Sequence, residues 1–132
     1  MKKMFILLFV VFSVNSYAAS LQPSDFKLIE AVGIPLFSKA TFVYGTKDVG
    51  FRFASSTPPE EVQKWYHQKL PKWALYNKHG IWILYDGAPG IVGMGEVMSK
   101  NRVWVQHNDN LPQWHSIDKN MTTEIVIMMA IK

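Results

Sequence analysis

An amphipathic helix between two groups of β-strand segments is the feature that most constrains the fold of this 132-residue chain. Residues 57–60, Thr-Pro-Pro-Glu, have the order of a helix start, with Thr57 as N-cap, proline in the first turn and glutamate three residues after the cap. Pro71 ends the helix. A single apolar stripe follows the start at helical spacing, through Val62, Trp65, Tyr66 and Leu70. The sequence therefore predicts one main helix with one buried side.

Strand-forming segments precede and follow this helix. β-Branched and aromatic residues at 41–44 and an alternating segment at 50–54 flank a glycine-containing turn, which predicts a hairpin. Further strands are predicted after the helix, at 73–77, 81–85, 102–107 and 122–132. A hairpin, one helix and several more strands are typical of an α+β fold, with an antiparallel sheet packed on one main helix.

Three other segments carry weaker signals. Ser24 is placed to cap a short helix at 25–32, which Gly33 would end. The segment 91–99 is ambiguous between helix and strand, because its glycines weaken any regular assignment. The polar segment 108–120 predicts a long loop.

The first 18 residues have the order of a secretory signal. Lys2 and Lys3 precede an apolar run at 4–14, and small residues lead up to Ala18. The run is too short to span a membrane as a helix, which needs about 20 residues. We expect a signal peptide at 1–18 with cleavage after Ala18, or alternatively after Ala19. Residues 19–132 then form a single α+β domain that is periplasmic or secreted, with no membrane span after cleavage.

Composition excludes several classes of function. Without Lys2 and Lys3 the net charge falls from +4 to +2, and the basic residues are scattered, so we expect no nucleic-acid partner. The chain has no cysteine, which excludes disulfides, thiol catalysis and cysteine-ligated metals. No G-x-S-x-G elbow and no dinucleotide fingerprint occurs, so we predict no catalytic residue and no cofactor.

Roughly half of the chain resembles a loose group of small exported bacterial α+β domains of unknown function. The matching motifs are Pro35-Leu36-Phe37, Phe51-Arg52-Phe53, the Thr57-Pro58-Pro59-Glu60-Glu61-Val62 helix start, Trp65-Tyr66 and Leu70-Pro71-x-Trp73. The resemblance implies that a strand pair leads into a helix, that this helix brings an aromatic pair to the core, and that later strands complete the sheet. It carries no catalytic residue to this chain.

Alternation within the strands predicts a second, uncovered face of the sheet. If Ile81, Ile83, Val103, Val105 and the row beginning at Ile125 face the helix, the alternate residues face away from it. This predicts a partly apolar binding surface made of Trp82, Leu84, Trp104, Gln106 and Met128. The alternative is that the segment at 19–40 or a loop covers this face.

These observations favour an exported, non-enzymatic binding module that uses an aromatic sheet face. Its partner is an unknown envelope protein or a second copy of the chain. One alternative is a module that binds cell-wall glycans by stacking sugars on tryptophan. A less favoured alternative is a small metal-dependent hydrolase, for which His107, Asp109 and His115 are weak candidate ligands.

The signal assignment predicts a mature N-terminus at Ala19. N-terminal sequencing and intact-mass measurement of the protein recovered outside the cytoplasm should both give this start. Ala18→Arg places a large cation where signal peptidase accepts a small side chain, and should leave the precursor uncut. Recovery of the wild-type protein with Met1 still attached would contradict the assignment.

Overall fold

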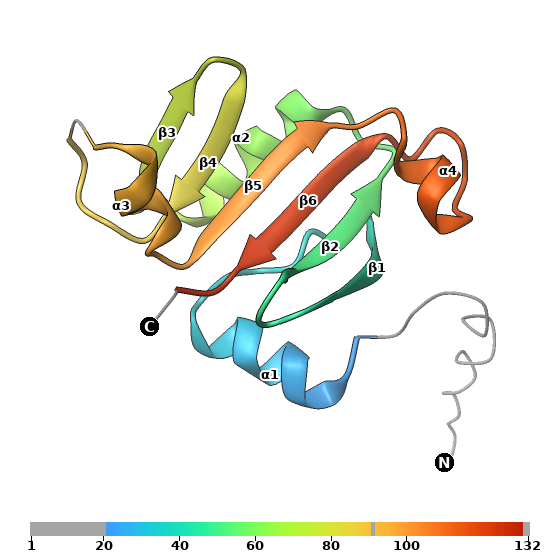
Figure 1. The fold of residues 1–132 in the computed structure, drawn as a ribbon, viewed down its shortest axis with the longest axis horizontal. Helices are drawn as coiled ribbons and strands as arrows, with labels where there is room; N and C mark the ends of the chain where they lie inside the picture. Colours follow the sequence, from blue (N-terminus) through green and yellow to red (C-terminus); the bar gives the residue numbers. More distant parts are fainter. Residues whose placement is uncertain (1–20, 91, 131–132) are drawn as a thin grey trace, which may run out of the picture.

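The computed structural model describes residues 21–90 and 92–130, and their strands form one six-stranded antiparallel sheet (Figure 1). The strand order is β1-β2-β6-β5-β4-β3. In chain order the strands are β1 (Ala40–Thr46), β2 (Gly50–Ser55), β3 (Ala74–Lys78), β4 (Ile81–Tyr85), β5 (Arg102–His107) and β6 (Thr123–Met128). The final strand is thus inserted between β2 and β5, so that it joins the first hairpin to the second half of the chain.

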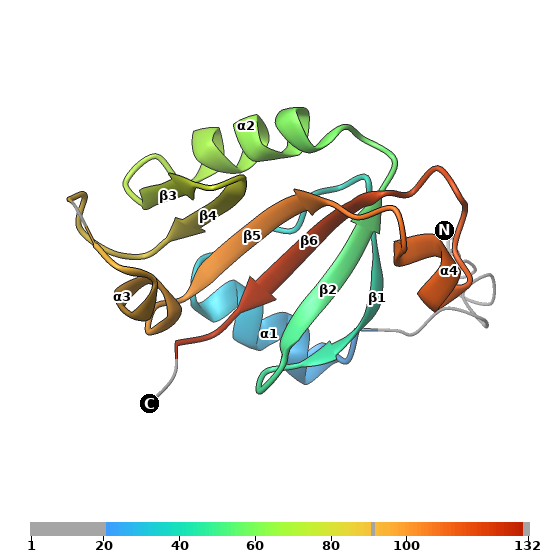
Figure 2. The same ribbon diagram turned by 45° about the horizontal axis from the view of Figure 1, so that its top comes forward.

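Four helices flank the described sheet: α1 (Pro23–Ala31), α2 (Pro59–Lys69), α3 (Met94–Met98) and α4 (Leu111–His115). Figures 1 and 2 show α1 and α2 on one side of the sheet, and the short helices α3 and α4 on the other side. The predicted α+β fold with an antiparallel sheet is therefore confirmed. Within the described residues, no helix has the length and apolar character needed to cross a membrane.

The predicted hairpin of β1 and β2 forms, β3 and β4 form a second one, and the turns of both depend on unusual backbone angles. His79 and Gly80 have φ angles of 55° and 78°, as a two-residue type I′ turn between β3 and β4 requires. In the β1–β2 hairpin, Gly45 has a φ of 129°, and a Cβ atom built on it would lie 2.0 Å from the carbonyl oxygen of Gly50. Only glycine fits at that close approach of two backbones.

The main helix begins one residue later than predicted. Its N-cap is Pro58, which has no side-chain capping bond, so the prediction of Thr57 as N-cap is wrong. Thr57 is held in the connection before the helix, where its N–H donates to Ser55 Oγ and its carbonyl accepts from Thr123 Oγ1 at 2.6 Å. Glu60 and Glu61 lie in the first turn, where negative charge is favourable near the unpaired backbone N–H groups.

Two segments without a firm helix prediction contain short helices. The segment 91–99 contains α3, and the predicted loop 108–120 contains α4. Leu111 explains why α4 forms, because its fully buried side chain packs against Val43 and Ala54 on the sheet. The last strand ends at Met128, earlier than predicted, and Ile131 lies outside the described residues.

The main core lies between the sheet and the layer of α1 and α2. Leu84, Val103, Ile127 and Phe51 form a continuous row of cross-strand partners on this side. The row packs in one cluster with the predicted stripe residues Val62, Tyr66 and Leu70 of α2, and α2 lies against β4 and β5. Each fully buried side chain of this kind contributes about 1.5–3 kcal/mol to the free energy of unfolding.

The segment before β1 extends this same layer. Ile29 of α1 and Ile34 are buried in the core that α2 covers. Phe37 packs edge-on against Trp65, with ring centroids 5.2 Å apart. The segment at 19–40, as far as it is described, therefore packs on the helix side and does not cover the opposite face of the sheet.

The predicted orientation of β4 is wrong. Trp82 and Leu84 face α2 and belong to the main core, and Trp82 is only 8% exposed. Ile83 instead faces the opposite side, as the direct partner of Trp104. All five residues of β4 are apolar, so its sequence has no alternation that marks a buried side. The pairing of Leu84 with Val103 decides the orientation.

Tyr66 predicts a loss of stability in alkali. Its side chain is fully buried, and this burial raises the pKa of the phenol well above its usual value near 10, although a backbone hydrogen bond with Phe37 acts in the opposite direction. Above about pH 10 the unfolded chain loses this proton while the folded chain keeps it, so stability falls as pH rises. Urea unfolding between pH 9 and 11 should show a shallower decline for Tyr66→Phe than for wild type; parallel declines would contradict this account.

Candidate functional site

We call the side of the sheet opposite α1 and α2 the open face. A row of cross-strand partners runs across it through all six strands: Tyr76, Ile83, Trp104, Val126, Arg52 and Tyr44. A β-bulge between Phe42 and Tyr44 shifts the register of β1, and so places Tyr44 opposite Arg52. Bulges of this kind commonly redirect a side chain at a functional surface.

The two short helices cover only the ends of the open face. At one end Val97 of α3 is fully buried against Ile83 and Tyr85. At the other end Leu111 of α4 packs on β1 and β2 through Val43 and Ala54. The alternative prediction, that a loop covers this face, is met only at these ends. The middle of the sheet, between α3 and α4, stays uncovered (Figure 1).

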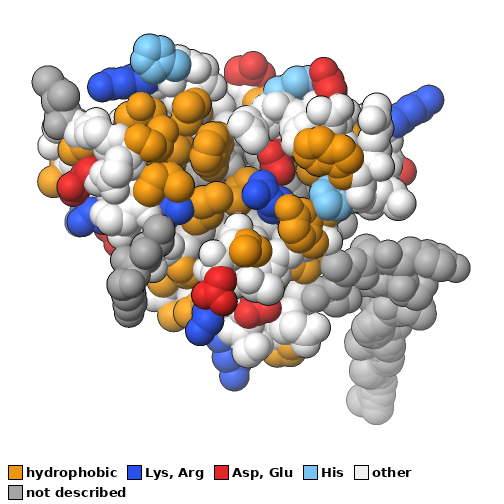
Figure 3. Space-filling view, in the orientation of Figure 1, with side chains coloured by type: hydrophobic (Ala, Val, Ile, Leu, Met, Phe, Trp, Pro, Cys, Tyr) orange, Lys and Arg blue, Asp and Glu red, His pale blue; other side chains and the backbone are white. Residues whose placement is uncertain are grey.

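The part of the open face next to α3 is apolar. Figure 3 shows apolar side chains gathered over β3, β4 and β5. Tyr76, Ile81 and Trp104 are only partly buried there and pack around the buried Ile83. Trp104 Nε1 is buried without a hydrogen-bond partner among the described residues. An unpaired buried donor destabilises a fold by about 1–3 kcal/mol, so packing alone does not account well for a tryptophan here.

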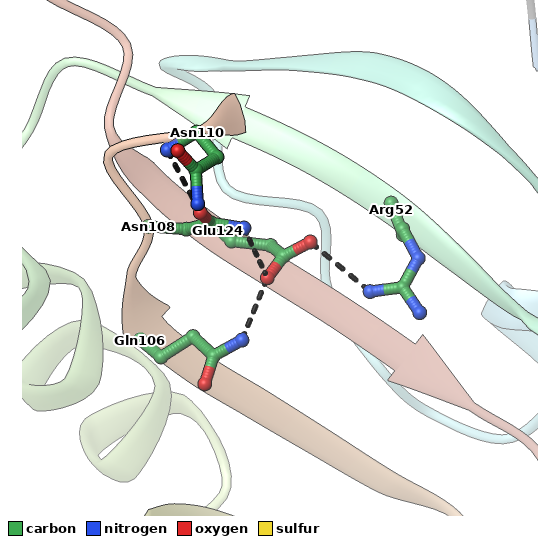
Figure 4. Close-up of polar contacts among 5 residues, drawn as sticks. All are labelled: Arg52, Gln106, Asn108, Asn110 and Glu124. Carbon is green, nitrogen blue, oxygen red and sulfur yellow. Dashed lines mark hydrogen bonds and ion pairs between the residues drawn. The ribbon is translucent and has the colours of Figure 1, made fainter. Parts of the chain in front are cut away.

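A buried carboxylate occupies the centre of the open face (Figure 4). Glu124 is 3% exposed and accepts hydrogen bonds from three side chains. Arg52 Nη1 donates to it at 3.0 Å, Gln106 Nε2 at 2.7 Å and Asn108 Nδ2 at 3.4 Å. The Asn110 N–H donates to Asn108 Oδ1 at 3.0 Å, which fixes that amide in turn. The charge of Glu124 is therefore balanced and its oxygens are occupied within the protein.

The sheet register explains how this cluster forms. Gln106 is the direct partner of Glu124 on β5, and Ala54 is its partner on β2. Arg52 is the partner of Val126, two residues from Glu124 along β6, so its side chain reaches the carboxylate diagonally. Our prediction included Gln106 but missed Glu124 and Arg52. The available signal was a single charged residue, Glu124, in a strand that is apolar from Ile125 to Met128.

A second aromatic group adjoins the cluster on the side of α4. Tyr44 is 43% exposed, and its ring stacks on His115 with centroids 4.9 Å apart and an interplanar angle of 28°. The Arg52 guanidinium carbon lies 5.5 Å from the centroid of the same ring. The tyrosine ring is therefore engaged by two groups of the protein itself.

The structure brings together three of the five predicted binding residues. Trp104, Gln106 and Met128 lie on the open face, on β5 and β6. Trp82 and Leu84 lie in the core beneath α2 instead, so they are not available to a partner on the open face.

The weak metal candidates do not form a site in the described structure. His107 Nε2 lies 2.7 Å from Asp109 Oδ1, and both side chains are exposed. His115 stacks on Tyr44. Across residues 21–90 and 92–130, no group of three or more His, Asp or Glu side chains is arranged to hold a metal ion.

Comparison with known proteins finds no matching family model, no similar curated protein and no similar solved structure. The resemblance to small exported domains therefore stays a prediction from sequence motifs, and the function has to be argued from the geometry of this chain.

The central ion pair predicts strong coupling between Arg52 and Glu124. Arg52→Met leaves a buried carboxylate without its cation and should lower the free energy of unfolding by about 2 kcal/mol. Arg52→Met combined with Glu124→Leu should cost clearly less than the sum of the two single changes. Urea unfolding of the four proteins measures this coupling, with Arg52→Lys as a control that retains the charge. Additive losses would show that the pair does not stabilise the fold.

Proposed function

We propose that this chain is an exported binding module that docks a protein partner on the open face of its sheet. The observation that carries the proposal is the apolar part of that face next to α3, where Tyr76, Ile81 and Trp104 are only partly buried. Apolar surface gathered between covered ends favours burial against another molecule.

The residue types of the open face also support a protein partner. Aromatic residues, methionine and arginine are enriched at protein interfaces relative to other surfaces. The open face carries Tyr44, Tyr76, Trp104, Met128 and Arg52. In the centre, the occupied carboxylate of Glu124 presents no unpaired charge, so a partner buries this region without leaving a carboxylate unsatisfied.

Glycan binding has less support from the same residues. A sugar that stacks on an aromatic ring needs a free ring face, whereas Tyr44 already contacts His115 and Arg52. Glu124 and Gln106 hydrogen-bond to each other rather than presenting free groups to a ligand. The ring of Trp114 is 63% exposed, but it lies on α4 outside the row of strand residues. The geometry therefore favours a protein surface over a polysaccharide.

The export of this module rests on its N-terminal sequence. Residues 1–20 lie outside the described structure, so the signal at 1–18 is supported by its order of basic, apolar and small residues alone. An exported chain meets partners in the cell envelope or outside the cell. We therefore propose an envelope protein, or a second copy of this chain, as the partner.

Site-specific photocrosslinking tests the open face directly. p-Benzoylphenylalanine in place of Tyr76 or Trp104 should give a crosslinked adduct in intact cells, and mass spectrometry of the adduct identifies an envelope protein or a second copy. The matched control is the same amino acid in place of Phe26, which is 46% exposed on α1, on the other side of the sheet. A substitution at Trp82 is unsuitable, because that side chain is buried in the core.

Ile81→Asp places a charge on the apolar part of the open face and should reduce the adduct at least tenfold, whereas Ile81→Leu should leave it unchanged. Tryptophan fluorescence of both variants checks that the fold is retained. Adducts that form equally well from Phe26, or that survive Ile81→Asp, would rule out the open face as the docking surface.

A further inference from the structure

A cleft of about 870 Å³ lies at one end of the sheet, separate from the middle of the open face. Figure 1 shows α1, the β1–β2 turn and the end of β6 converging there. Its walls are largely apolar and are formed by Leu28, Val32, Val49, Met98, Met128 and Met129. Sites for small ligands commonly have volumes of about 300–1,000 Å³, apolar walls and a few fixed polar groups.

Arg102 is a buried cation in the lining of this cleft. Arg102 is 3% exposed, and no carboxylate among the described residues lies within 4.0 Å of its side-chain nitrogens. Nη1 donates to the carbonyls of Met98 and Lys100 at 2.8 Å each. Burial lowers the pKa of Arg102, because removal from water disfavours the charged form.

One edge of this guanidinium is poorly satisfied. Within residues 21–90 and 92–130, Nε is buried without a hydrogen-bond partner, and Nη2 contacts only the thioether sulfur of Met128 at 3.1 Å. A thioether is a weak acceptor. The Nε and Nη2 donors of arginine form a planar fork that matches the two oxygens of a carboxylate. The structure therefore holds such a fork in place with a flexible methionine beside it.

We infer that the cleft binds an aliphatic carboxylate, whose charged end pairs with the Nε–Nη2 edge of Arg102. The Met128 side chain rotates away to admit it, and the hydrocarbon chain lies against Met98, Met129 and Val32. Lys47 at the cleft wall adds a second positive charge and Asp48 one negative charge, which leaves the lining net positive with Arg102. The cleft shares Met128 with the open face, but this inference does not rest on the proposed protein-docking function.

Isothermal titration calorimetry with decanoate, below its micellar concentration, tests the inference on the purified protein. One decanoate should bind per chain. Decanol, which lacks the charge, should bind at least tenfold more weakly, and decyltrimethylammonium should not bind in the same range. Absence of decanoate binding, or equal binding of decanol, would overturn the proposed site.

Two sets of variants connect the binding to Arg102. Arg102→Gln removes the cation and should weaken decanoate binding at least tenfold. Arg102 also hydrogen-bonds to several backbone carbonyls, so a second test leaves Arg102 unchanged and uses Val49. Val49 is 58% exposed on the β1–β2 turn and lines the cleft. Val49→Asp should weaken binding about threefold relative to its neutral match Val49→Asn, with a smaller difference in high salt. Equal affinities at low salt would exclude a charge-selective cleft.

Discussion

The row of Leu84, Val103, Ile127 and Phe51 beneath α2 is the constraint on which the rest of the structure depends. Side chains alternate between the faces of a strand, so a register shift of one residue would turn every side chain of a strand to the other face. Fixing this row against α2 therefore fixes which residues point to the open face. The same register places Trp104 beside Ile83 and Val126, and brings Gln106 opposite Glu124.

The sheet carries large apolar side chains on both faces, although Arg52, Gln106 and Glu124 interrupt them on the open face. Helices α1 and α2 cover the main core on one side, whereas α3 and α4 are short and cover only the ends of the other. At the centre of the open face lies the Glu124 cluster, in which three side-chain donors occupy the carboxylate. What remains uncovered is the apolar region around Trp104, which we propose as the docking surface, and the separate cleft at Arg102.

Much of the element order could be predicted, because it depends on local signals. The two hairpins follow from turn residues and β-branched segments, and the apolar spacing of Val62, Tyr66 and Leu70 correctly marks the buried side of α2. Prediction of the site was less complete. Trp104, Gln106 and Met128 were assigned to the correct side, but Trp82 was not, because an all-apolar strand has no alternation to indicate its orientation. The bulge that presents Tyr44 has no evident local signal in the sequence.

The sequence by itself determined the class of fold, the position of the main helix, and the presence of more apolar strand surface than one helix can cover. Only the tertiary structure decided which side of β4 meets α2, that Arg52 and Glu124 pair diagonally between β2 and β6, and that Arg102 is buried with no carboxylate beside it among the described residues. The physical reason is that turns, caps and helical stripes depend on residues close in the chain. Strand register and charge pairing instead depend on contacts between distant segments, such as the 72 residues that separate Arg52 from Glu124.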